Sequence, residues 1–180
     1  MSRGGHGLEQ PAPHLGFLTI QQDASGYFGG YLVTNAWGRP LEFRLTTSVT
    51  PNKVQQLLYG STLRPYICSD LLGKVLVEKA NTAVSLILTD NDAALDLRQH
   101  LSLPVVWLNG GQVQSERADE LISVSSTRTQ SLTILKKYQS DIEPIKDLLQ
   151  QSAVSDLSEP FARVREAIAE ARKMNQYKAA

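Results

Sequence analysis

Three apolar runs separated by short turns, followed by a capped helix, constrain the fold of this chain more than any other feature. Residues 41–46 (LEFRLT) alternate apolar and polar side chains, which is the period of a half-exposed strand. Residues 16–21 and 30–34 are two further strand-like runs bounded by turn residues. The sequence therefore predicts an antiparallel three-stranded meander. Pro40 stands at the start of the third strand, where a missing N–H does least harm.

Helical patterns follow the meander. Thr50 can cap a helix, Pro51 suits the first helical position, and Gly60 can end it. The apolar side chains of this helix recur at helical spacing and are expected to face the core: Val54, Leu57 and Leu58. A second helix is predicted over residues 63–80, where apolar residues recur every four positions.

The second half of the chain begins with a compact strand–helix–strand unit. Residues 84–89 and 104–108 are strand-like, and Asp90 can cap a short helix over residues 91–100. Such a unit favours parallel strands joined by a right-handed crossover.

Further strands are predicted over residues 120–125 and 131–138, and Ser140 to Glu143 match a capping box. A C-terminal amphipathic helix follows, with one apolar face made by Phe161, Val164, Ile168 and Ala171. The predicted fold class is α/β (mixed α+β): an N-terminal antiparallel three-stranded meander, two helices, a strand–helix–strand unit, further strands and the C-terminal helix.

The length and composition predict a single domain. A chain of 180 residues suits one domain and can bury a core without covalent staples. We expect residues 1–14, rich in Gly and Pro, to form a disordered tail. Residues 15–174 should form a single globular domain, and residues 175–180 a frayed tail.

The charges are balanced, with 18 Lys and Arg against 18 Asp and Glu. This balance removes the usual electrostatic argument for nucleic acid or an anionic membrane as partner. The N-terminus lacks the apolar segment of a secretory signal, and no apolar run is long enough to span a membrane. With a single cysteine, no intramolecular disulfide can form. We therefore expect a cytoplasmic protein without a membrane partner, and nothing in the sequence indicates a cofactor.

The leading candidate binding site is the turn from Asn35 to Pro40, with Glu42 and Arg44 beside it. Trp37 offers an aromatic anchor for a partner, since Trp and Arg dominate interface hot spots. Arg39 and Arg44 could bind phosphate or carboxylate groups. The favoured interpretation, however, is an ordinary hairpin in which Trp37 folds over the edge of the core and Glu42 pairs with a neighbour of Arg44.

A second candidate is the acidic sequence Thr89-Asp90-Asn91-Asp92, which follows a predicted parallel strand. Two carboxylates and an amide oxygen at such a position could hold Mg²⁺ or Ca²⁺. Against this, Asp90 is a natural helix cap, and Asp92 falls in the first turn, where the helix dipole favours anions. Asp90 and Asp92 are therefore weak metal candidates, and capping is the favoured interpretation.

The remaining candidates each have a simple structural alternative. His6 and His14 fall in the predicted tail, and His100 follows a short helix. Cys68 is better explained as a small packing residue than as a nucleophile. The segment from Gly60 to Arg64 could bind an anion on the free backbone N–H groups at the start of a helix, assisted by Arg64. The stop of one helix and the start of the next explain these residues equally well.

These observations lead to three hypotheses about function. The leading one is a non-catalytic cytoplasmic interaction protein, a subunit or adaptor of a larger complex with a protein partner, and we assign no catalytic residue. The first alternative is an accessory factor in nucleic-acid or nucleotide processing, binding phosphates through Arg39, Arg44, Arg64 and Lys53. The second is a metal-dependent hydrolase that uses Asp90 and Asp92.

Overall fold

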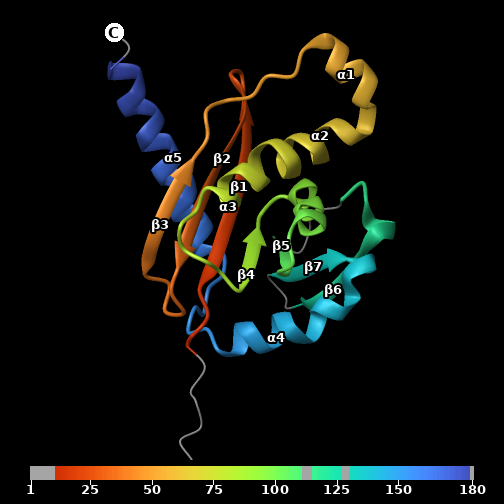
Figure 1. Cartoon of the computed structure of the whole chain (residues 1–180), viewed down its shortest axis with the longest axis vertical. Coiled ribbons are helices and arrows are strands. Elements are labelled where there is room, and N and C mark those ends of the chain that lie inside the picture. Colours follow the sequence, from red (N-terminus) through yellow and green to blue (C-terminus); the bar gives the residue numbers. More distant parts are fainter. Residues whose placement is uncertain (1–10, 111–114, 127–129, 179–180) are drawn as a thin grey trace, which may run out of the picture.

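The computed structural model describes residues 11–110, 115–126 and 130–178. These residues form a seven-stranded mixed sheet with the strand order β3-β2-β1-β4-β5-β7-β6 (Figure 1). The mixed α/β class predicted from the sequence is confirmed. The predicted meander and the predicted strand–helix–strand unit belong to one sheet, because β4 of the unit pairs with β1 of the meander.

The N-terminal meander consists of β1 (Leu15–Asp23), β2 (Gly26–Thr34) and β3 (Pro40–Leu45). Both pairings are antiparallel, as predicted. Leu32 stands opposite Phe17 on one side and opposite Phe43 on the other, so these three side chains share a face of the sheet. β3 is the edge strand at this end of the sheet.

The strand–helix–strand unit has the predicted parallel strands. β4 (Leu86–Thr89) is parallel to β1, and β5 (Val105–Asn109) is parallel to β4. The connection between β4 and β5 is a 3₁₀ helix, η3 (Asp92–His100). β7 (Ser131–Leu135) then pairs antiparallel with β5, and β6 (Leu121–Ser126) forms the far edge.

The first helical segment departs from its predicted ends. α1 spans Lys53–Tyr59, and its cap is Asn52, so both Thr50 and Pro51 lie outside the helix. The next stretch is continuous, as predicted, but it contains a π-helical section. Its parts are η1 (Gly60–Thr62), α2 (Leu63–Pro65), the π-helix η2 (Tyr66–Gly73) and α3 (Lys74–Glu78).

Two helices complete the chain. α4 (Ile142–Gln150) follows a short 3₁₀ segment, and its cap residue Asp141 makes no side-chain capping bond, so the predicted capping box is wrong. α5 (Glu159–Lys178) continues beyond Met174. A short 3₁₀ turn, η4 (Ala118–Glu120), precedes β6.

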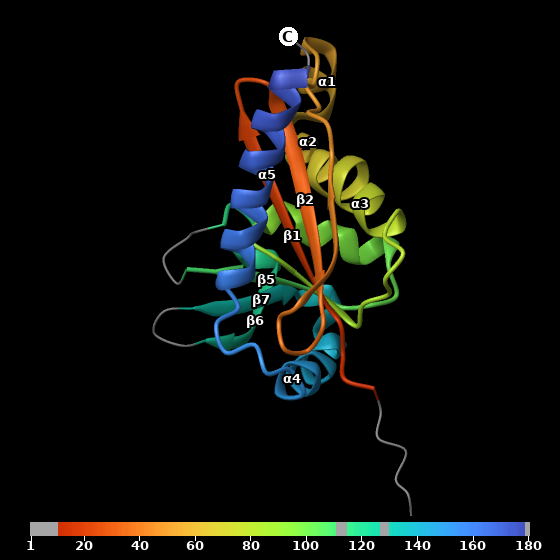
Figure 2. The same cartoon turned by 90° about the vertical axis from the view of Figure 1, so that its left-hand side faces the viewer.

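The sheet is covered on both faces. Figure 2 shows α5 along one face and α2 and α3 along the other. One core cluster joins the sheet to η2, α3 and η3, and the other joins it to α4 and α5. Covered on both faces, the central strands carry apolar residues on both sides, and every residue of β4 is buried. No helix in the described part of the chain combines the length and apolar content needed to cross a membrane.

Candidate functional site

The turn between β2 and β3 is built by Asn35. Its side-chain oxygen accepts hydrogen bonds from the backbone N–H groups of Trp37 and Arg39, both at 3.0 Å. Gly38 adopts a φ of 79°, a conformation that favours glycine. This turn holds Trp37 away from the protein with 71% of its surface exposed. The favoured interpretation from the sequence, that Trp37 folds over the core edge, is therefore wrong.

A cavity of about 390 Å³ adjoins Trp37. Its other wall is the segment that leads into α5, including Val154 and Asp156. Arg163 of α5 also lines it and is paired with Glu159 at 2.9 Å. Trp37 thus stands at the rim of a shallow surface hollow with mixed charge.

Glu42 and Arg44 belong to β3 rather than to the turn. Glu42 accepts hydrogen bonds from the backbone N–H of Asn81 at 3.0 Å, from that of Thr82 at 2.8 Å and from Arg44 Nε at 2.6 Å. The pKa of Glu42 is lowered to about 2, chiefly by the Asn81 N–H, with further contributions from Thr82 and Arg44. Glu42 therefore ties the edge strand to the α3–β4 connection, and its predicted pairing with a neighbour of Arg44 is replaced by a bond to Arg44 itself.

Asp90 lies where β4 ends, and it links two other elements. Its Oδ2 atom accepts a hydrogen bond from Thr19 of β1 at 2.5 Å and pairs with Arg165 of α5. Burial raises the pKa of Asp90, although the Thr19 hydroxyl and the Arg165 charge oppose the change. The prediction that Asp90 caps the following helix is wrong, because its carboxylate is directed toward α5.

Asn91 is the residue that caps η3. Its side-chain oxygen accepts from the backbone N–H of Ala93 at 3.0 Å and from Arg64 at 2.9 Å. Arg64 also pairs with Asp92 at 2.9 Å, and Asp92 accepts a further bond from Ser115 at 2.5 Å. Asp92 occupies the first turn of the helix, as predicted.

The two weak metal candidates therefore point to different partners on opposite faces of the sheet. Asp90 faces α5, whereas Asp92 faces α2 through Arg64. Within the described ranges, no three His, Cys, Asp or Glu side chains are grouped so that they could hold a metal ion. Both carboxylates serve as ion-pair partners that hold neighbouring elements together.

A cavity of about 390 Å³ lies beside Arg64, between η1, α2, η3 and η4. Arg117 on its wall pairs with Asp96 at 3.0 Å and with Glu120 at 2.7 Å. Four acidic and two basic side chains line this cavity, and the two arginines pair with three of the carboxylates, those of Asp92, Asp96 and Glu120. A lining with this excess of acidic groups does not suit the anion that the sequence suggested beside Arg64.

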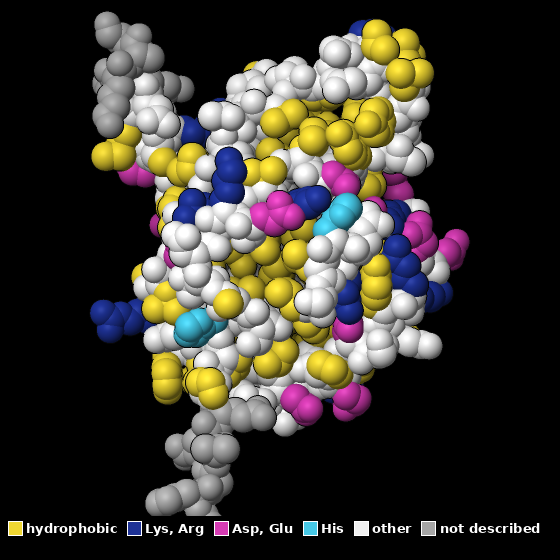
Figure 3. All heavy atoms as spheres, viewed as in Figure 1, with side chains coloured by type: hydrophobic (Ala, Val, Ile, Leu, Met, Phe, Trp, Pro, Cys, Tyr) yellow, Lys and Arg dark blue, Asp and Glu magenta, His cyan; other side chains and the backbone are white. Residues whose placement is uncertain are grey.

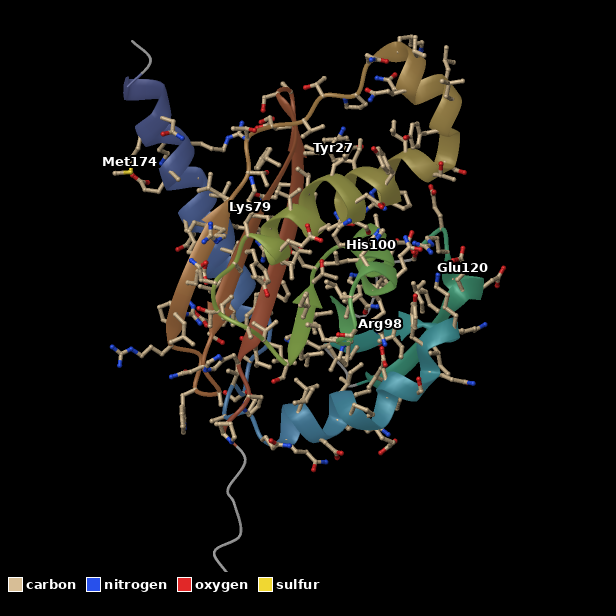
Figure 4. All side chains as sticks on the ribbon, viewed as in Figure 1. Tyr27, Lys79, Arg98, His100, Glu120 and Met174 are labelled. Carbon is tan, nitrogen blue, oxygen red and sulfur yellow. The ribbon has the colours of Figure 1, made fainter. Side chains whose placement is uncertain are left out.

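The histidines and the cysteine have structural surroundings. His100 Nε2 contacts Asp70 Oδ1 at 2.6 Å, and the neighbouring Arg98 pairs with Asp141 at 2.7 Å (Figure 4). His14 lies 3.2 Å from the carbonyl oxygen of Ala83, whereas His6 lies outside the described residues. Cys68 is fully buried, and burial raises the pKa of its thiol to about 12.

The most exposed apolar surface is on α1, and sequence reasoning missed it. Val54, Leu57 and Leu58 were expected to face the core, but 62%, 71% and 79% of their respective surfaces are exposed. The prediction was wrong because periodicity identifies an apolar face without showing what covers it. α1 stands at the outer end of the helical run and projects from the sheet (Figure 1). Figure 3 shows apolar side chains gathered at the surface at this end of the protein.

Neither a protein-family model nor a curated protein matches the chain. Among solved structures, it overlaps Marinitoga piezophila Argonaute in complex with a 5′-OH guide RNA, at a TM-score of 0.39 and 13% identity. That match covers 78% of this chain but only 25% of Argonaute, so the chain spans about a quarter of that protein.

Ciona intestinalis endonuclease V, bound to DNA containing an inosine followed by a ribo-adenosine, is matched in two structures. The complex with a 23mer gives a TM-score of 0.41 at 8% identity, covering 68% of this chain and 70% of that one. The complex with a 24mer gives 0.39 at 10% identity, covering 75% and 56% respectively. Likeness at this level does not assign to our chain what these proteins bind.

Proposed function

We propose that this chain is a non-catalytic interaction protein, a subunit or adaptor of a larger assembly, and that α1 is its docking element. One observation supports this most directly: three large aliphatic side chains lie on one face of α1 and are exposed. Val54, Leu57 and Leu58 have the i, i+3, i+4 spacing with which a helix fills a groove in another protein. Exposed apolar clusters of this kind commonly mark interaction sites.

The short length of α1 also supports a docking role. A helix of seven residues is marginal in water without tertiary packing. α1 is supported by the capping box between Asn52 and Gln55, with two bonds of 2.9 Å. Tyr59 at its end also stacks on Tyr66 of η2, with the ring centres 4.6 Å apart. A partner that covered the apolar face would supply the packing on which short helices depend.

The surface of α1 also indicates the chemistry of the partner. No Asp or Glu occurs between Glu42 and Asp70, and α1 itself carries Lys53. An apolar groove with an acidic rim complements this surface. Burial of the three aliphatic side chains would contribute about 3–6 kcal/mol before the cost of association. Two α1 helices packed face to face would bury far less than a stable interface needs, roughly 800 Å² per partner.

The phosphate-binding alternative has less support, because its four cations do not converge. Arg44 pairs with Glu42, and Arg64 pairs with Asp92. Lys53 is on α1, whereas Arg39 is in the β2–β3 turn at the other end of the protein (Figure 1). On the face shown in Figure 3, basic and acidic side chains are interspersed.

The proposal is tested by affinity purification of the tagged full chain, with and without nuclease, read by mass spectrometry. We expect a stoichiometric partner that survives nuclease. The double variant Leu57→Gln/Leu58→Gln should lose this partner while it remains folded, since both side chains are exposed.

Trp37→Ala/Arg39→Ala provides the matched comparison, since Trp37 is equally exposed but lies in the distant turn. Retention of the partner by this variant would locate docking at α1, and its loss would move the docking site to the turn. Recovery that depends on nucleic acid and falls steeply with salt would instead support the phosphate-binding alternative. If the Leu57/Leu58 variant keeps every partner, α1 is not the docking element.

A further inference from the structure

We propose that the open edge of β3 pairs with β3 of a second copy of this chain, so that two sheets join into one. β3 is the terminal strand of the sheet, and its outer side is not paired with any described strand. Figure 2 faces this edge, which lies between α5 on one face of the sheet and α3 on the other. This inference is independent of the docking role of α1.

The backbone groups that face the open edge are identified by the pairing with β2. Thr46 donates its N–H to the carbonyl oxygen of Gly29, so the backbone of Thr46 points toward β2. Because successive residues of an antiparallel strand alternate in direction, Glu42 and Arg44 also point their backbone groups inward. The N–H and C=O groups of the intervening residues Phe43 and Leu45 therefore point outward, whereas Leu41 lies at the register shift that sets Thr34 opposite Pro40.

Three residues of β3 carry exposed apolar side chains: Leu41, Phe43 and Leu45 are 44%, 38% and 39% exposed. Phe43 stands opposite Leu32, which belongs to the core beneath α5, so Phe43 and Leu45, two residues along the strand, lie on the α5 face. An exposed apolar edge strand is an aggregation hazard unless it is covered. Both edge strands carry a register irregularity, but β6 is rich in serine, whereas β3 exposes apolar side chains.

The charges on β3 select a second copy as the occupant and also fix the register. An antiparallel pairing centred on Phe43 places Phe43 opposite Phe43 of the second copy and Leu41 opposite Leu45. It also places Arg44 of each copy opposite Glu42 of the other, a favourable cross-strand pair. This contact would add to the bonds that Glu42 accepts from Arg44, Asn81 and Thr82 within its own copy. Displacing the strands by two residues would instead set Glu42 against Glu42 or Arg44 against Arg44, which is unfavourable.

This register also pairs backbone groups of the open edge. Phe43 meets Phe43 of the second copy as a hydrogen-bonded pair, which would add about two backbone hydrogen bonds at the centre of the contact. The two-fold axis stands perpendicular to the sheet, so Phe43 and Leu45 of both copies come together on the α5 face. Both Glu42–Arg44 pairs meet on the opposite face, beside a cavity of about 450 Å³ that Arg44 and Lys79 line. Figure 4 labels Lys79, which directly follows α3.

Position-specific disulfide trapping tests the register. In Phe43→Cys, the two new cysteines would face each other with Cα atoms about 5.5 Å apart, within the disulfide range of about 4.4–6.8 Å. In Leu41→Cys alone, the two cysteines would be roughly 13 Å apart, too far to join. A mixture of Leu41→Cys and Leu45→Cys should form a crosslinked heterodimer, although neither variant crosslinks alone. The native Cys68 is buried and should not interfere.

Sedimentation of the full chain over a wide concentration range provides the second measurement. We expect a dimer that Phe43→Lys converts to monomer, because the substitution places two like charges opposite each other. Ser123→Lys on the exposed part of β6 is the matched control and should leave the dimer intact. Circular dichroism establishes that Phe43→Lys remains folded. A wild-type monomer at every concentration, or crosslinking without preference for position 43, would overturn the proposal.

Discussion

Gly30 of β2 lies directly beneath Ile168 of α5. A Cβ atom at position 30 would come within 2.7 Å of Ile168 Cδ1 and 2.8 Å of Val164 Cγ1. The Gly30→Ala variant should therefore be destabilised, because α5 must move away from the sheet. Overpacking of this kind typically costs about 1–3 kcal/mol. The midpoint of urea unfolding measures the loss.

Gly110→Ala is the control, since a Cβ at position 110 meets no atom within 4 Å. We expect it to unfold at nearly the wild-type urea concentration. Equal midpoints for Gly30→Ala and wild-type would show that α5 is not packed against β2 as described.

The regular elements of the fold were predictable, because local patterns determine them. The alternation in residues 41–46 located β3, and the apolar runs around β4 and β5 gave two parallel strands. The joining of these parts into one sheet was not predictable. The pairing of β1 with β4 links residues about 70 positions apart, and no local pattern encodes such a partner.

For the candidate sites too, features set by local sequence were predictable and those set by distant residues were not. The turn from Asn35 to Pro40 was predictable because its sequence reflects its local geometry, but the favoured expectation that Trp37 folds over the core edge was wrong. The cap of η3 was assigned to Asp90 instead of Asn91, because Asp90 pairs with Arg165, which is distant in sequence. The exposure of α1 was missed because an amphipathic helix has the same sequence pattern whether its apolar face meets the core or a partner.

The thiol of Cys68 should be inert in the folded protein. It is fully buried, and its pKa is raised to about 12, so only about one thiol in ten thousand is ionised at pH 8. A thiol reagent should react with the folded chain only as fast as the chain opens, and at once in denaturant. Ser123→Cys, at an exposed position, supplies a fast-reacting control. Rapid labelling of Cys68 without denaturant would contradict its described burial.

Glu42 should make folding sensitive to acid. Its pKa is lowered from an ordinary value of 4.5 to about 2, so its carboxylate contributes stability that is present above pH 4.5. This contribution is lost as the pH falls through the folded value. The Glu42→Gln variant should therefore be less stable than wild-type at neutral pH, and the difference should shrink between about pH 5 and pH 2. Urea unfolding at a series of pH values measures it.

Glu143→Gln is the comparison, because Glu143 forms an exposed pair with Lys146 that should contribute little. Its effect should be small at every pH. If the difference between Glu42→Gln and wild-type stays constant down to pH 2, the bonds from Asn81 and Thr82 do not lower the pKa of Glu42 as described.

Asp90 should have the opposite effect to Glu42 on how stability depends on pH. Burial raises its pKa above that of the unfolded chain, so its stabilising contribution is present below the unfolded value and is lost as the pH rises through the folded value. In Asp90→Asn, the amide oxygen can still accept the Thr19 hydrogen bond but does not titrate. Relative to this variant, wild-type should therefore lose stability as the pH rises from acid toward neutral. Thr19→Val should strengthen the dependence, because the Thr19 hydroxyl favours the ionised form of Asp90. A pH-independent difference between wild-type and Asp90→Asn, or one of opposite slope, would show that the Arg165 pair outweighs burial at this position.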